Sequence, residues 1–173
     1  MDITHLSRDY YVRCLAENDV PAVLTLCAGN PLYYEYCPPA ASAESIRADM
    51  TALPPGKGAD DKYYIGFFDN DALLAVLDLI AGYPDEKTAY IGFFMTDANV
   101  HRQGIGSKIV RELCAGLARQ RFEKVKLCWM AGNSQAEGFW HKNGFLETGD
   151  THERDGHKVI SACRTLAPRA SGG

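Results

Sequence analysis

The chain has 173 residues, of which 46% are hydrophobic and 23% charged, and its formal net charge is −4 at pH 7. These values are typical of a folded domain and exclude disordered and collagen-like proteins, while the lack of a Lys/Arg-rich run argues against nucleic acid as a partner. No apolar run reaches the roughly 18 residues of a membrane-spanning helix, and the first residues lack a signal-peptide pattern. No membrane association and a cytoplasmic location are therefore expected.

The first third of the chain predicts one strand and two helices. The strand covers 10–15, and the first helix begins at Asn18 or Asp19 and runs to about Cys27. The segment 30–39, rich in aromatic residues and proline, is predicted to be a loop. The second helix covers 42–53, with Ser as its cap and Pro-Pro-Gly after its end.

The remainder alternates between apolar strands and amphipathic helices. Three strands in succession are predicted by runs of apolar and aromatic residues: 62–68, 73–80 and 88–96. After them follow a strongly amphipathic helix, a strand, a second helix and a hairpin with Asp155-Gly156 as its turn: 104–119, 124–129, 133–142, and 145–149 with 158–163. We expect one α/β domain over 1–167, followed by a flexible tail over 168–173. Its sheet has about seven strands, mostly antiparallel, with a central β-α-β crossover and about four helices.

The six cysteines are scattered, and no two of them have the spacing of a zinc or redox motif. They predict small residues in a reduced protein rather than a disulfide framework or a metal site. No metal is expected, and a catalytic cysteine has no support in the sequence.

A glycine-rich segment lies between the strand at 88–96 and the helix that follows it. It reads His101-Arg102-Gln103-Gly104-Ile105-Gly106-Ser107. The start of a helix leaves N–H groups unpaired, and glycine lets a phosphate come close to the backbone, so the segment suits a pyrophosphate. It does not fit two well-known phosphate loops: Ile109 replaces the third glycine of a Rossmann fingerprint, and Ser107-Lys108 reverses the P-loop order. The alternative is a tight strand-to-helix connection without a ligand.

Two signatures together resemble the GNAT superfamily of N-acetyltransferases. The stretch 94–106 resembles its acetyl-CoA motif, Gln/Arg-x-x-Gly-x-Gly/Ala after a strand, and 133–145 resembles its second signature, Asn-x-x-Ala-x-x-[Leu/Phe]-Tyr-x-x-x-Gly-Phe. The resemblance covers about 62–145. Two positions depart from the pattern, since His101 stands where Gln or Arg is usual and Trp140 where Tyr is usual. In the family that Tyr often protonates the leaving CoA thiolate; an indole cannot do so, and a core aromatic is the alternative for Trp140.

The resemblance implies a GNAT-type fold and direct acetyl transfer from acetyl-CoA to a primary amine of a small molecule or peptide, in a ternary complex. The oxyanion would be held by a backbone N–H, which we place at Thr96. Asn133 would bind the pantetheine arm or simply cap a helix. The full set expected to contact acetyl-CoA comprises Phe94, Met95, Thr96, Arg102, Gln103, Gly104, Ile105, Gly106, Ser107, Asn133 and Trp140.

The amine must lose a proton, and two carboxylates are candidate general bases. Glu35 lies in the loop that often covers the acceptor site in this family, and Asp78 is an acid in an otherwise apolar strand. For Asp78 the alternative is a strand-end residue that bonds the next turn. The tyrosines beside Glu35 could hold a cation or could serve ordinary packing: Tyr33, Tyr34 and Tyr36.

Two further functions remain open from the sequence. One is a non-catalytic CoA-binding sensor or interaction domain, and the other is a partner-binding module in which the glycine loop is purely structural. A homodimer is possible.

Overall fold

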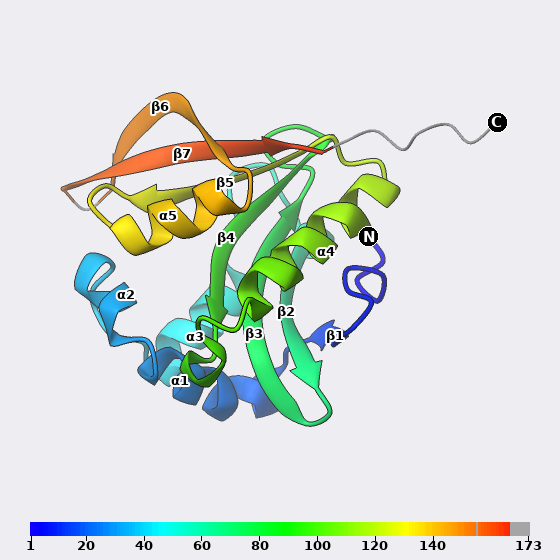
Figure 1. The fold of residues 1–173 in the computed structure, drawn as a ribbon, viewed down its shortest axis with the longest axis vertical. Helices are drawn as coiled ribbons and strands as arrows, with labels where there is room; N and C mark the ends of the chain where they lie inside the picture. Colours follow the sequence, from blue (N-terminus) through cyan, green and yellow to red (C-terminus); the bar gives the residue numbers. More distant parts are fainter. Residues whose placement is uncertain (155, 167–173) are drawn as a thin grey trace.

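The structure, a computed structural model, describes residues 1–154 and 156–166 (Figure 1). Within them the chain forms one seven-stranded sheet with the order β1-β2-β3-β4-β5-β7-β6. The strands are β1 (Tyr11–Cys14), β2 (Lys62–Asp69), β3 (Ala72–Ala81), β4 (Thr88–Thr96), β5 (Lys124–Met130), β6 (Leu146–Arg154) and β7 (His157–Thr165). All neighbouring pairs are antiparallel except β4 and β5, which are parallel and joined by a helical crossover, as the sequence predicted.

In the part of the chain that the structure describes, five α-helices cover the two faces of the sheet. They are α1 (Val20–Ala28), α2 (Pro31–Tyr36), α3 (Ala43–Thr51), α4 (Ile105–Arg119) and α5 (Ser134–Lys142), with short 3₁₀ turns at Glu17–Asp19, Ala59–Asp61 and Ala98–Val100. Apolar residues of α4 and α5 form one buried cluster, and those of α1 and α3 form a second. We call these two sides of the sheet the α4 face and the α1 face. None of the described helices combines the length and the apolar character needed to cross a membrane.

Most predicted elements are confirmed within one or two residues, and two differ. The segment 30–39, expected as a loop, contains the short helix α2, which Pro31 begins as its first residue. The first strand of the final hairpin does not end at Gly149. Gly149 takes a left-handed conformation with φ of 84°, and the pairing with β7 shifts register there and then resumes to Arg154. Asp155 of the predicted turn and the tail 168–173 lie outside the described residues.

The parallel pair β4–β5 is short. Its register runs from Thr88 opposite Lys124 to Ile91 opposite Leu127, and beyond that point both strands continue without pairing to one another. On its other side β4 remains paired with β3, through a bulge at which Gly92 is the extra residue. A gap therefore opens between the second halves of β4 and β5, in the middle of the sheet. We call it the β4–β5 gap.

Candidate active site

One side of the β4–β5 gap is lined by free backbone groups of β4. Asp97 N–H donates to the Leu74 carbonyl at 2.8 Å, which fixes the direction of the hydrogen bonds between β3 and β4. Because peptide groups alternate in direction along an antiparallel strand, Met95 N–H also points to β3, while the N–H groups of Phe94 and Thr96 point into the gap. From the sequence we placed the oxyanion donor at Thr96, and expected Phe94, Met95 and Thr96 to contact acetyl-CoA; of these three, Met95 has its N–H group directed to β3.

The end of β4 leads directly into the glycine loop and α4. Arg102 and Gly104 both adopt left-handed backbone conformations, with φ of 61° and 80°, and Gly104 caps α4 without a side-chain bond. The first helical bond runs from Lys108 N–H to the Gly104 carbonyl at 2.9 Å. Among the described residues, the N–H groups from Arg102 to Ser107 donate to no backbone carbonyl. Such a row of free donors at a helix start is the arrangement that binds a phosphate.

The two glycines of this loop have different surroundings. A Cβ added at Gly104 would meet no atom within 4 Å, so the space in front of it is open. A Cβ at Gly106 would stand 3.3 Å from Phe139 Cε2 and 3.4 Å from Thr96 Cγ2. Gly104 therefore leaves room for a ligand, whereas Gly106 lets α4 pack closely against α5 and β4.

Residues of the second signature have clear packing roles. Asn133 is buried and caps α5, accepting a hydrogen bond from Ala136 N–H at 3.0 Å. Trp140 is only 8% exposed. Its ring packs against Phe139 and Phe145 with centroids 5.0 Å apart, and against Phe94 at 5.9 Å. The core-aromatic alternative for Trp140 is thus confirmed, and this core directly adjoins Phe94.

The two candidate bases lie in different settings. Glu35 is exposed on α2, and no hydrogen-bond or ion-pair partner is recorded for it within the described part of the chain. Beside it, Tyr33 packs edge-to-face on Tyr34 at 5.0 Å and on Phe93 at 5.6 Å, which is the ordinary packing considered as the alternative to a cation clasp. Burial raises the pKa of the Tyr34 hydroxyl, so this group stays neutral.

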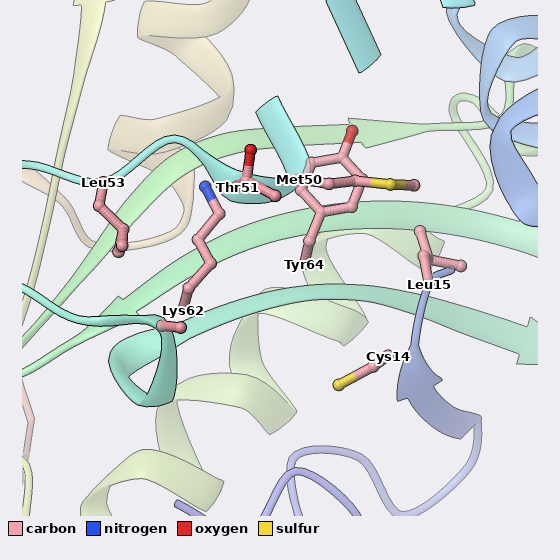
Figure 2. Close-up of a pocket in the computed structure, with 8 residues that line it drawn as sticks. Cys14, Leu15, Met50, Thr51, Leu53, Lys62 and Tyr64 are labelled. Carbon is pink, nitrogen blue, oxygen red and sulfur yellow. The ribbon is translucent and has the colours of Figure 1, made fainter. Parts of the chain in front are cut away.

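Asp78, by contrast, is largely but not fully buried, inside β3 and on the α1 face. Its Oδ2 atom is 2.9 Å from Lys62 Nζ of β2, so the interpretation as a strand-end residue that bonds a turn is wrong. Burial raises the pKa of Asp78, and the neighbouring Lys62 ammonium opposes this shift. Lys62 also lines a pocket of about 210 Å³ between β2 and the end of α3, where Figure 2 shows it beside Tyr64 and Thr51.

Several residues that support the site were missed in the sequence. Asn30 and Lys62 act on partners far away in the chain, and no local pattern marks them. The same holds for Asn143, which donates to Ser107 Oγ at 3.2 Å. Gly92 could have been found, because a lone glycine inside an apolar strand indicates a bulge.

The gap between the parallel strands β4 and β5 leads to a row of free N–H groups at the start of α4, an arrangement that suits a long ligand ending in a pyrophosphate. A family model described as the acetyltransferase (GNAT) family matches residues 30–145. The chain belongs to this family, and by that membership it is an acyltransferase. The match begins at α2, further towards the N-terminus than the resemblance found in the sequence.

Solved structures of acetyltransferases share the fold. An acetyltransferase from Thermus thermophilus is 17% identical, with a TM-score of 0.73, over 92% of this chain and 98% of that one. The ribosomal-protein-S18-alanine N-acetyltransferase from Escherichia coli is 15% identical, with a TM-score of 0.67, over 95% and 98%. A ribosomal L7/L12 alpha-N-protein acetyltransferase in complex with coenzyme A is 21% identical, with a TM-score of 0.67, over 95% and 98%. No curated protein sequence gives a significant match.

Proposed function

We propose that this protein transfers the acetyl group of acetyl-CoA to a primary amine, by direct attack within a ternary complex. The observation that carries the proposal is the β4–β5 gap, which presents the free N–H groups of Phe94 and Thr96 and ends at the open loop around Gly104. A thioester arm lying in this gap would meet hydrogen-bond donors along its length. The pyrophosphate would then reach the start of α4.

The N–H groups of the loop would hold the pyrophosphate, from Arg102 through Gln103, Gly104, Ile105 and Gly106 to Ser107. Phe94, Met95 and Thr96 would line the pantetheine arm and the acetyl group. Asn133 already uses its side-chain oxygen as a helix cap, which leaves its amide nitrogen for the arm. Trp140 would contribute through the packing that fixes Phe94.

The chemistry needs a preorganised donor for the oxyanion that forms on the thioester carbonyl. The Thr96 and Phe94 amides are the donors of β4 that face the gap, and Phe94 lies nearer to the point where the gap opens. The departing CoA thiolate takes its proton from water, because Trp140 offers an indole and no titrating group. A side-chain acid contributes about 10²–10⁴-fold, so its absence is compatible with a slow enzyme.

For the acceptor, the α-amino group of a peptide is the first class to test. Two of the proteins with this fold are named for acetylating ribosomal proteins, one at an alanine and one at an alpha-amino group. The net charge of −4 also favours a cationic acceptor over an anionic one. A small-molecule amine is the other class. All six cysteines are free thiols, which supports the cytoplasm as the location.

The test is a screen of amines with acetyl-CoA that measures released CoA thiol and confirms the acetylated product by mass spectrometry. Peptides beginning with Ala or Ser would be compared with the same peptides blocked at the N-terminus, and with polyamines and free amino acids. We expect transfer to an unblocked primary amine. Binding of acetyl-CoA without transfer to any amine would instead identify a CoA-binding sensor.

A further inference from the structure

The Asp78 carboxylate lies at the point where the β4–β5 gap begins. Asp78 is paired with Phe93 across the bulge, and a Cβ on Gly92 would stand only 2.8 Å from Asp78 Oδ2. Gly92 directly follows Ile91, the last residue of β4 that pairs with β5. Asp78 projects on the α1 face, as does its cross-strand neighbour Tyr64, whereas the glycine loop leads into α4 on the opposite face. The carboxylate is thus placed across the sheet from the CoA-binding helix.

One oxygen of this carboxylate is held and the other is free. Lys62 Nζ binds Oδ2 at 2.9 Å and also donates to the Ala52 carbonyl at 2.8 Å, so its position is fixed from two sides. Side-chain exposure is 6% for Lys62 and 14% for Asp78. Asp78 Oδ1 is the one side-chain nitrogen or oxygen in the described residues that is fully buried without a hydrogen-bond partner. A buried acceptor without a donor is costly, and a donor supplied by a ligand would remove that cost.

We propose that Asp78 is the proton acceptor for the incoming amine, and that Lys62 is a positioning residue that orients its carboxylate. This assignment rests on the proposed acetyl transfer. Asp78 Oδ1 would accept a hydrogen bond from the ammonium of the acceptor and then take one of its protons. The neutral amine attacks the thioester carbon, the new C–N bond forms and the C–S bond breaks. The nitrogen of the adduct releases its second proton to water, the leaving thiolate takes one proton from water, and the proton held by Asp78 also returns to water.

The surroundings of Asp78 make its carboxylate a stronger base than an exposed one. Burial raises its pKa, which brings a carboxylate closer to the basicity that proton transfer from an ammonium needs. The other ionisable groups that act on it are Lys62 and Tyr64 of β2 and Asp49 of α3. Glu35 lacks these features, because it is exposed on a short helix.

The sharpest test is the double variant Lys62→Met with Asp78→Asn. Removing both charges leaves no unpaired ion in the core, so we expect it to fold and to bind acetyl-CoA as the wild type does. We expect kcat/KM for the amine near neutral pH to fall by about 10²–10⁴-fold. That deficit should shrink as the pH approaches the pKa of the amine itself, because a free amine needs no proton acceptor. Lys62→Met alone should move the acidic limb of the wild-type pH profile to higher pH, since the carboxylate loses its cation.

Asp19→Asn is the matched control. Asp19 pairs with Arg13 at 2.7 Å, and its side chain is 17% exposed, close to the 14% of Asp78, so this variant neutralises a paired acid of similar exposure away from the gap. It should keep kcat/KM and its pH profile. Two outcomes for the double variant would overturn the role of Asp78 as proton acceptor and leave the proposed acetyl transfer standing. One is a kcat/KM within about twofold of wild type, and the other is a loss of kcat/KM that is the same at every pH. A wild type that binds acetyl-CoA but acetylates no amine would overturn the proposed function and this role together.

Discussion

The Asn30 side-chain nitrogen donates a hydrogen bond to the Thr96 carbonyl at 3.0 Å, and the same nitrogen donates to the Leu26 carbonyl at 2.9 Å. This contact ties the end of α1 to the end of β4. His101 Nε2 is 3.4 Å from the same Thr96 carbonyl. Asn30 and His101 therefore fix the position of the Thr96 carbonyl, and the N–H group of Thr96 is left to point into the β4–β5 gap.

Asn30→Ala removes both hydrogen bonds and leaves the two carbonyls without that donor. We expect a loss of about 1–3 kcal/mol in the free energy of unfolding and several-fold weaker acetyl-CoA binding, because the Thr96 peptide becomes less fixed. Urea unfolding and calorimetry would measure the two effects. Asn18→Ala is the control, since Asn18 is exposed and no hydrogen bond is recorded for it within the described residues. Unchanged stability and affinity in Asn30→Ala would show that the contact is dispensable.

Gly104→Ala tests the loop with the smallest possible change. The left-handed backbone costs an alanine about 1–2 kcal/mol, and the new methyl group enters the open space in which we place the pyrophosphate. We expect a folded protein whose affinity for CoA falls at least about tenfold. CoA at 100 times the wild-type Kd adds roughly 2.7 kcal/mol to the stability of the wild type and would add about 1.4 kcal/mol or less to that of the variant. Calorimetry and the thermal shift with CoA report this.

Gly56→Ala is the matched control for that variant. Gly56 has φ of 82° and also no atom within 4 Å of an added Cβ, but it lies in the turn after α3. It should lose the same stability and keep its CoA affinity. Equal CoA affinity in the Gly104 and Gly56 variants would contradict the pyrophosphate assignment. Gly106→Ala differs from both, because its methyl group presses on Phe139 and Thr96.

Trp140 tests whether the departure from the usual Tyr matters to the chemistry. Trp140→Phe keeps an aromatic ring among Phe94, Phe139 and Phe145, so we expect a folded enzyme with little loss of turnover. Trp140→Ala should cost about 3–5 kcal/mol, because it opens a cavity in the core. A hundredfold drop in turnover of the Phe variant, with intact acetyl-CoA affinity, would assign a chemical role to the indole.

The sequence predicted those parts of the fold that depend on local pattern. The amphipathic period of α4 and the apolar run of β4 are strong signals, and both elements have nearly the predicted bounds. The helix α2 was missed because it has only six residues. The strand β6 was predicted too short because Gly149 was taken for the end of the strand, whereas it lies in a bulge after which the pairing with β7 resumes. In each case the outcome depends on tertiary packing that outweighs local preference.

The candidate site divides in the same way. The glycine loop has a motif of its own, so the sequence could place it between β4 and α4. The ion pair between Asp78 and Lys62 could not be read from the chain, because it depends on the register of β2 against β3. An acidic residue in an apolar strand indicates that its carboxylate has a charged or hydrogen-bonding partner, but the sequence does not say which residue that partner is.

The alternation of peptide direction along β4 has a consequence for amide hydrogen exchange. Without a ligand, the N–H groups of Phe94 and Thr96 face the gap and should exchange with solvent rapidly, while Met95 N–H, bonded to β3, exchanges slowly. Acetyl-CoA in the gap would slow the two fast amides and leave the amide between them unchanged. Exchange measured by NMR would therefore show a fast-slow-fast pattern along three consecutive residues, which disappears when the arm of the ligand binds.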